Sequence, residues 1–426
     1  MLAPEENEVL TRVGKGTPMG ELMRQHWTPV CLLEEVEERD GTPLLVEVLG
    51  ERFVAFRDSN GKIGLLDELC PHRRASLVLG RNEECGLRCL YHGWKMDVEG
   101  NVVAMSSEPN GSPLMSKVKH RSYPTKEWGG FLWAWFGARE SVPEFDPPAF
   151  APTEKTRISI LKIRIPCNWA QIHEGQIDSA HSSSLHSSDM VPARVERASA
   201  DDKSWYRPST DKSPVMQIQT TSYGFHYAAI RRPIKNADTH NYLRITEFIA
   251  PYYSLIPPNN MYNIASVIVP IDDVTTAFHF IAWGADDVPA TEEWRKFAHA
   301  QKGIDVNDRW EPVRTWENRY LQDRQAMKLG NFTGIDGIPN QDIAMWVTQG
   351  PIADRSVDVL GASDLAIVEF RRLMVEAARK VADGGKAIGT EEPRVRQATI
   401  ASREGVYPKG VDWRTLSDGN SSVAAE

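Results

Sequence analysis

The stretch CPHRRASLVLGRNEECGLRCLYHGW, residues 70–94, decides how the first part of this chain folds. It places Cys70 and His72 one residue apart and, after a gap of 16 residues, Cys89 and His92 two residues apart. Two thiolates and two imidazoles are the ligands of a two-iron, two-sulfur cluster in which histidines replace cysteines on one iron. We therefore expect Cys70 and Cys89 to hold one iron of a [2Fe-2S] cluster, and His72 and His92 to hold the other.

A structural zinc site is the alternative, because zinc also accepts two cysteines and two histidines. Zinc fingers usually group the cysteines together and the histidines together, whereas each pair here contains one of each, and this favours the cluster. Cys85 lies four residues before Cys89 but has no histidine at the matching offset. We interpret Cys85 as a small buried side chain.

The sequence around this motif predicts a small all-β domain. From Thr28 to about Phe136, short apolar runs alternate with turn signals, which is typical of antiparallel strands. The first 26 residues contain the amphipathic segment GELMRQHW and are expected to be helical. The proline-rich stretch VPEFDPPAFAP at 142–152 predicts a boundary. We therefore expect a helical segment at 1–26, a cluster domain at 27–150 and a second domain at 151–426.

The second domain has the pattern of an α+β fold. ISILKIRI (158–165) and NYLRITEFIA (241–250) are strand-like, whereas ATEEWRKFAHA (290–300) and WENRYLQDRQAMK (316–328) are helical in character. Residues 364–382 predict a long helix that begins behind a Ser363 cap and ends before two glycines.

Composition excludes several functional classes. The chain has 426 residues, a net charge of -9 and a pI near 5.7, so it lacks the concentration of Lys and Arg that a nucleic-acid surface needs. We expect no nucleic-acid partner and no membrane span, because no apolar stretch approaches about 18 residues. Five scattered cysteines suit a reducing compartment and metal ligation, so we expect a cytoplasmic protein.

A second motif lies in CNWAQIHEGQIDSAHSSSLHSSDM, residues 167–190. Asp178 and His181 are three residues apart and would share one helix face, whereas His186 falls off that face. We therefore expect the helix to break at the serine run 182–184. Two imidazoles and one carboxylate form the facial triad of iron(II) oxygenases, which leaves positions open for dioxygen.

The carboxylate of this triad must come from later in the chain. Asp342, in IPNQDIAMW, is the best candidate because it starts an apolar segment well separated in sequence. The pattern alone leaves other aspartates open, namely Asp336, Asp354, Asp358 and Asp364. His173 and Glu174 are also close to the motif, and we interpret them as structural or supporting residues.

With both motifs in this order, the chain resembles the large subunits of Rieske non-haem iron aromatic-ring hydroxylases. The segments TRVGKGTPMGELMRQHW, SSSLHSSDMVPA and QGPIADRS resemble the branch that contains phthalate 4,5-dioxygenase. The resemblance covers roughly residues 5–400. It implies an N-terminal all-β Rieske [2Fe-2S] domain followed by a helix-grip (START-like) catalytic domain with an antiparallel sheet.

The resemblance also implies roles and partners. His181, His186 and Asp342 match the ligands of a mononuclear Fe(II), and Asp178 matches an aspartate that links this iron to a cluster histidine of the neighbouring subunit. Within one subunit of the family the two centres are too far apart for fast electron transfer, so a homotrimer or a stacked homohexamer is implied. A separate NADH-dependent reductase with flavin and an iron-sulfur cluster is implied too, since the chain has no dinucleotide fingerprint.

The resemblance implies an oxygenase that adds both atoms of O2 to an aromatic carboxylate, most directly phthalate, to give a cis-4,5-dihydrodiol. Arg207 and Arg244 match positions of a carboxylate clamp, with Arg231 and Arg232 as alternates, and Ser179 adds a hydrogen bond. The alternatives are isophthalate or another aromatic acid as substrate, and O-demethylation of a methoxylated aromatic acid. A different class is a Rieske electron-transfer protein without catalysis.

Overall fold

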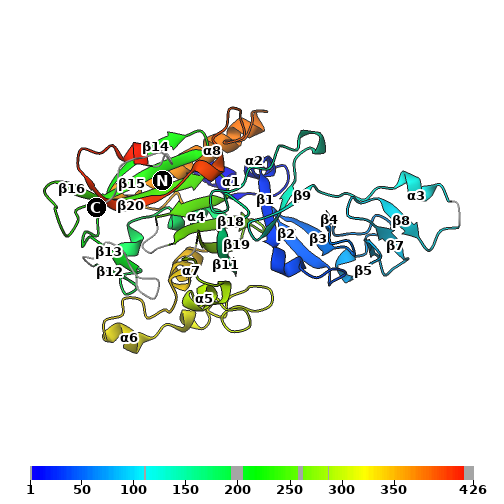
Figure 1. Ribbon diagram of the computed structural model, residues 1–426, viewed down its shortest axis with the longest axis horizontal. Helices are drawn as coiled ribbons and strands as arrows, with labels where there is room; N and C mark the ends of the chain where they lie inside the picture. Colours follow the sequence, from blue (N-terminus) through cyan, green and yellow to red (C-terminus); the bar gives the residue numbers. More distant parts are fainter. Residues whose placement is uncertain (1, 110–111, 193–204, 258–261, 286, 417–426) are drawn as a thin grey trace. The chain divides into compact units, whose positions relative to one another are not determined.

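The computed structural model describes residues 2–109, 112–192, 205–257, 262–285 and 287–416. The chain divides into two compact units (Figure 1). The smaller unit contains residues 14–16 and 23–145, and the larger contains residues 1–13, 17–22 and 146–426. Helix α2 (Pro18–Arg24) crosses this division, so most of the predicted N-terminal helical segment belongs to the larger unit rather than to the domain that follows it.

The smaller unit consists of three antiparallel sheets, as the sequence predicts. The first has the order β1 (Trp27–Leu32), β10 (Phe131–Trp135) and β9 (Thr125–Trp128). The second contains β2 (Leu44–Val48), β3 (Glu51–Arg57) and β4 (Ile63–Asp67). The third contains β5 (Arg81–Glu83), β6 (Gly86–Arg88), β7 (Trp94–Met96) and β8 (Val102–Met105). A short helix, α3 (Leu114–Lys117), follows β8.

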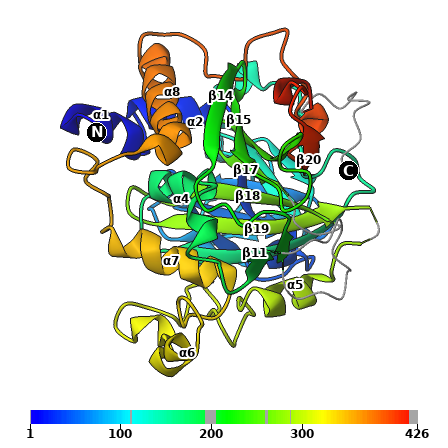
Figure 2. The same cartoon turned by 90° about the vertical axis from the view of Figure 1, so that its left-hand side faces the viewer.

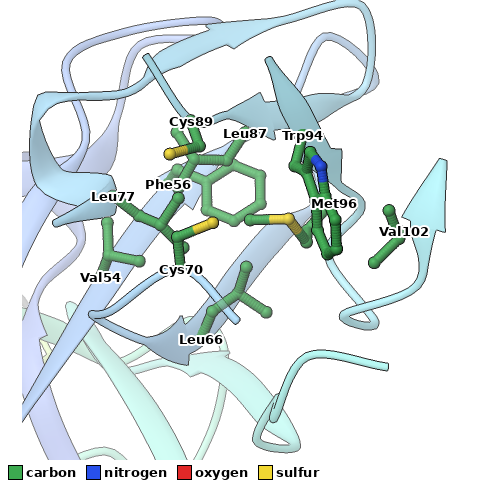
Figure 3. Close-up of a cluster of buried hydrophobic side chains, with 10 residues drawn as sticks. All are labelled: Val54, Phe56, Leu66, Cys70, Leu77, Leu87, Cys89, Trp94, Met96 and Val102. Carbon is green, nitrogen blue, oxygen red and sulfur yellow. The ribbon is translucent and has the colours of Figure 1, made fainter. Parts of the chain in front are cut away.

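An apolar core joins the second and third sheets of this unit (Figure 3). It contains Val54, Phe56, Leu66, Leu77, Leu87, Trp94, Met96 and Val102, together with Cys70 and Cys89. The two cysteines are therefore fixed in the packed interior, which gives their sulfur atoms a rigid support.

The larger unit is built on one antiparallel sheet, which confirms the predicted α+β fold. Its order is β11 (Arg157–Ile165), β19 (Thr276–Gly284), β18 (Asn263–Pro270), β17 (Tyr253–Ile256), β16 (His240–Ile249), β15 (Gly224–Arg231) and β14 (Val215–Thr221). An eighth strand, β20 (Arg403–Pro408), also pairs with β16. A separate parallel pair is formed by β12 (Met190–Pro192) and β13 (Trp205–Arg207).

Helices cover this sheet (Figure 2). The main ones are α1 (Pro4–Thr11), α4 (Trp169–Gln176), α7 (Ile338–Thr348) and α8 (Leu365–Ala382). The shorter helices α5 (Thr291–Phe297) and α6 (Arg324–Lys328) come between α4 and α7 in the chain. Helix α4 packs on β18 and β17 and lies beside α7, whereas α8 packs on β14 and α1. Among the described residues, no helix combines the length and the apolar character needed to cross a membrane.

Helix α8 confirms the long helix predicted at 364–382, because Ala366, Phe370, Leu373 and Ala377 form its buried stripe. The predicted Ser363 cap is wrong. The residue at the cap position is Asp364, whose carboxylate instead accepts a hydrogen bond from the Gly361 backbone N–H at 2.6 Å.

The predicted single helix at 316–328 is also wrong. Residues 319–321 have positive φ angles, and a new helix, α6, begins after Asp323. The Asp323 side chain accepts hydrogen bonds from the backbone N–H groups of Gln325 and Ala326, so a cap within the segment divides it.

Candidate functional site

Two loops of the smaller unit carry the cluster motif, and they have the same backbone pattern. In the first, the Cys70 N–H donates to the carbonyl of Ala75, and the N–H of Arg74 donates to the Cys70 carbonyl. In the second, Cys89 makes the equivalent bonds with residues five and four positions later, Trp94 and Gly93. Arg74 and Gly93 both have positive φ, of 61° and 72°. Each loop is therefore a closed turn that begins at its cysteine.

The two loops bring all four predicted ligands together. Cys70 and Cys89 are buried, whereas His72 and His92 are partly exposed, with their ring centroids 4.5 Å apart. The His72 ring stacks on Trp94 at 4.6 Å with an interplanar angle of 6°. The cysteine side of the site thus faces the core, and the histidine side faces outward.

This donor set fits a two-iron cluster better than a single zinc ion. Ligand atoms about 2.0–2.3 Å from one ion lie close together. Among the described residues, a group of three such ligand atoms within 4.8 Å of one another is formed by His181, His186 and Asp342, and not by the cysteines and histidines of this motif. Burial raises the pKa of the Cys70 thiol to about 11, so a thiolate there requires bound positive charge.

The second motif lies on a turn rather than on a helix, which corrects the prediction. Helix α4 ends at Gln176, before Asp178, and His181 starts a 3-10 turn, His181–Ser183. The Asp178 carboxylate oxygen Oδ1 accepts hydrogen bonds from the backbone N–H groups of Ala180 and His181, at 2.7 and 3.3 Å. This side-chain bond to the backbone favours a turn over a further helical turn, and sequence periodicity alone cannot reveal it.

The turn and helix α7 bring His181, His186 and Asp342 together. His181 Nε2 lies 3.1 Å from His186 Nε2, and Asp342 Oδ1 lies 3.5 Å from the first and 3.1 Å from the second. Three ligand atoms at right angles around one ion, each about 2.1 Å from it, would lie about 3 Å apart. These three residues therefore fit a facial metal site, and the alternative aspartates are not in the group.

The surroundings prepare both imidazoles for a metal. His186 Nδ1 lies 2.8 Å from the Oε1 of Gln341, so Nδ1 carries the proton and Nε2 is free to bind. Gln341 is itself held, because its Nε2 donates to Asp189 and to the Ile335 carbonyl, each at 2.9 Å. Burial lowers the pKa of His181, which favours the neutral ring that a metal requires.

A pocket adjoins these three residues, and its empty space together with the solvent at its open mouth amounts to about 580 Å³. Its lining includes the apolar side chains of Phe278, Phe280, Ile256, Ile338 and Met190. It also includes the polar side chains of Arg244, Ser179, Ser182, Tyr227 and Thr246. A flat apolar ring with charged substituents would match this mixed lining.

Both predicted substrate arginines are buried in this region. The Arg244 guanidinium pairs with Glu404 at 2.8 Å and donates to the Pro257 carbonyl at 2.9 Å. Arg207 does not line the pocket itself, and it donates to the hydroxyls of Ser183 and Ser182 at 2.9 and 2.8 Å. Ser179 lines the pocket, as expected from its position beside Asp178.

Sequence reasoning gave too little weight to Arg231 and did not identify Glu404, Gln341 or Tyr227. Arg231 is buried beside the predicted pair, whereas Arg232, the other alternate, is exposed. Alternation along a strand could have separated Arg231 from Arg232, since neighbours in a strand face opposite sides. No local signal points to Glu404, because it reaches Arg244 through pairing of strands that are distant in sequence.

Comparisons with known proteins identify both units. Residues 26–124 match the family model described as the Rieske [2Fe-2S] domain, and residues 134–425 match the one described as LigXa C-terminal domain like. The phthalate 4,5-dioxygenase oxygenase subunit of Pseudomonas putida is 62% identical over 97% of this chain and 94% of its own length.

More distant relatives extend the comparison. The 5,5'-dehydrodivanillate O-demethylase oxygenase subunit of a Sphingobium species is 31% identical over 93% of this chain and 86% of its own. A solved structure, the Pseudomonas putida CBB5 NdmA QL mutant with caffeine, aligns with a TM-score of 0.60 at 17% identity, covering 86% of this chain and 93% of that one. This structural likeness supports the fold.

Proposed function

The chain belongs to the Rieske non-haem iron oxygenases, and on that premise we propose that it is the oxygenase component that converts phthalate to a cis-4,5-dihydrodiol. Members of this family carry a Rieske cluster and a mononuclear iron. When bound, these groups supply one-electron transfer and dioxygen activation. The chain's own residues must then hold the metals, orient the substrate and exclude water.

A group of three buried arginines beside the pocket supports phthalate as the substrate. Arg207, Arg231 and Arg244 are only 5%, 2% and 5% exposed. Within the described part of the chain, Glu404 is the carboxylate that forms an ion pair with one of the three, Arg244. The Nε atoms of Arg207 and Arg231 are buried without a hydrogen-bond partner among the described residues.

Such a group needs an anion. Burial and the neighbouring arginines lower the pKa of Arg231 to about 10 and also lower that of Arg207. Buried cations in excess of their counter-ions are costly until a ligand neutralises them. A dicarboxylate supplies two negative charges, and each carboxylate matches the forked N–H groups of a guanidinium. Phthalate fits this excess better than a monocarboxylate does.

We assign the metal and substrate residues accordingly. Cys70, His72, Cys89 and His92 hold the cluster, whereas His181, His186 and Asp342 hold the iron. Arg244 and Ser179, which line the pocket, bind the carboxylates, Arg207 adds its charge and holds the pocket-lining Ser182 hydroxyl, and Phe278 and Phe280 contact the ring. We propose that Asp178 links the iron ligands to the cluster of a neighbouring subunit, a role supported on the iron side by its Oδ2, which lies 3.7 Å from His181 Nδ1.

A separate reductase must reduce the cluster, and we propose that it is NADH-dependent and carries flavin and iron-sulfur groups. We further propose a homotrimer or a stacked homohexamer, in which the cluster of one subunit serves the iron of the next. The outward-facing histidines His72 and His92 support this arrangement, since they lie on the accessible side of the cluster site.

The test is product analysis with a panel of aromatic acids. Reduced protein is incubated with phthalate, isophthalate, terephthalate and methoxybenzoates in the presence of O2, and products are identified by mass spectrometry. We expect a dihydrodiol from phthalate at the highest rate. Formaldehyde from a methoxybenzoate, with no dihydrodiol from any phthalate isomer, would instead support O-demethylation, the activity named for one relative.

A further inference from the structure

We propose that Tyr227 and Arg231 are positioning residues that hold the peptide on both sides of Asp178, so that its carboxylate stays against His181. This inference rests on the proposed function, since it assigns Asp178 a role in supplying electrons to the iron. It gives Arg231 a different task from the two substrate arginines, although all three are close together.

The two residues lie on the same face of β15, four positions apart, with Ala229 between them. The Tyr227 hydroxyl donates to the carbonyl of Ile177, the residue before Asp178, at 2.7 Å. Arg231 Nη2 donates to the carbonyl of Ser179, the residue after it, at 2.7 Å, and its Nη1 reaches the Ser179 hydroxyl at 3.3 Å. One strand therefore binds the turn at two points, with Asp178 between them.

These hydrogen bonds lie in a buried environment. Tyr227 and Arg231 are 1% and 2% exposed, and Ala229 between them is completely buried. Buried hydrogen bonds of this kind are strong because water does not compete for the same groups. Charged donors such as the Arg231 guanidinium strengthen them further.

The turn has little regular structure of its own, since it follows the end of α4 and precedes the 3-10 turn at His181. Its local bonds include the Asp178 carboxylate with the backbone N–H groups of Ala180 and His181, and the Ser182 hydroxyl, which donates to the Ser179 carbonyl at 3.1 Å. The bonds from Tyr227 and Arg231 add the attachment of this turn to the sheet. A shift of the Ile177 or Ser179 carbonyl would rotate this unit and move Asp178 Oδ2 from its place 3.7 Å from His181 Nδ1.

The main test uses Tyr227→Phe, which removes one hydroxyl and leaves the ring in place. Tyr223→Phe is the matched control, because its hydroxyl also makes a 2.8 Å bond in the larger unit, to Glu247, but not with the turn. The fully reduced protein is mixed with O2 and the aromatic acid that the wild type converts best, and oxidation of the cluster is followed by visible absorbance. Substrate binding is measured separately by equilibrium dialysis.

We expect Tyr227→Phe to slow oxidation of the cluster about tenfold or more, as small misplacements of reacting groups do, with substrate affinity within about twofold of the wild type. Tyr223→Phe should leave both quantities unchanged. A wild-type rate in Tyr227→Phe, or a slower rate explained by an equal loss of substrate affinity, would overturn the proposal.

A double-mutant cycle shows whether Tyr227 acts through Asp178. If it does, Tyr227→Phe combined with Asp178→Asn oxidises its cluster no more slowly than Asp178→Asn alone, whereas multiplying losses would contradict the inference. Arg231→Lys, which keeps the charge but loses the fork, is expected to behave like Tyr227→Phe. These measurements use whichever aromatic acid the wild type converts best. If phthalate proves not to be a substrate, the proposed function is refuted, but the roles of Tyr227 and Arg231 can still be tested.

Discussion

At the scale of single residues, the ion pair between Arg244 and Glu404 holds a cation in place at the pocket. The two face each other in the pairing of β16 with β20, and the Tyr242 hydroxyl also donates to Glu404 at 2.6 Å. This arrangement keeps a cation in the pocket wall and holds its guanidinium in one orientation. An arriving carboxylate would find the donor already placed, which reduces the ordering cost of binding.

Replacing Arg244 with Gln should therefore raise the KM for phthalate on the order of 100-fold, because charge-assisted hydrogen bonds to one carboxylate are lost. The turnover of bound substrate should change less. Steady-state kinetics with phthalate measure both quantities. Arg232→Gln is the control, since Arg232 is exposed and should alter KM by no more than about twofold. Equal effects of the two substitutions would remove Arg244 from the substrate site.

At the scale of elements, helix α4 connects the iron site to the rest of the larger unit through a buried group of ion pairs. Glu174 on α4 bonds to Arg355 Nε at 2.7 Å and to Arg371 Nε, on α8, at 2.8 Å. Arg371 also pairs with Asp358 at 2.7 Å. The sequence indicated a supporting role for Glu174, and the contacts place it where α4, α8 and the segment after α7 meet.

Substituting Glu174 with Gln should lower the free energy of unfolding by about 3 kcal/mol, because the buried Arg355 guanidinium loses its carboxylate partner and Arg371 is left with Asp358. Denaturant unfolding followed by circular dichroism measures this change. Glu376→Gln is the matched control, since Glu376 pairs with Arg372 on the exposed side of α8 and should change stability by less than about 0.5 kcal/mol. Similar losses of unfolding free energy in both variants would mean that the buried ion pairs of Glu174 stabilise the protein no more than the exposed pair of Glu376 does.

Local patterns predicted some elements well and others poorly. The extent of the α8 helix and the spacing of the cluster motif could be predicted because each depends on a short stretch of chain. The end of α4 could not be predicted in this way, since the Asp178 carboxylate accepts hydrogen bonds from the backbone N–H groups of Ala180 and His181, and this turn replaces the next helical turn. The positions of Glu404 and Tyr227 depend on strand register and on packing between distant segments, which no short pattern encodes.

At the scale of the whole molecule, the proposed arrangement of subunits passes electrons from the cluster of one subunit to the iron of the next. A chain that lacks a cluster ligand, such as His92→Ala, and a chain that lacks an iron ligand, Asp342→Ala, should each be inactive. When the two are produced together in equal amounts, the whole preparation should recover about a quarter of wild-type activity, since a quarter of all neighbouring pairs join an intact cluster to an intact iron site. Turnover of the mixed preparation, compared with each chain alone, measures this.

The single variants check the result. Asp342→Ala should keep the visible spectrum of the cluster while losing iron from the second site, which separates the two metal centres. For this check, oligomers that contain both chains are purified from the mixed preparation. If such oligomers remain as inactive as the single variants, electron transfer takes place within one chain, and the proposed arrangement of subunits is wrong.

A single turnover of the reduced protein with phthalate under ¹⁸O2 tests whether the protein is a phthalate dioxygenase. The proposed dioxygenase adds both oxygen atoms to one ring, so the cis-4,5-dihydrodiol should carry two labelled oxygens and the cluster should become oxidised in the same reaction. A product with one labelled oxygen, or cluster oxidation with phthalate recovered unchanged, would contradict the proposed function.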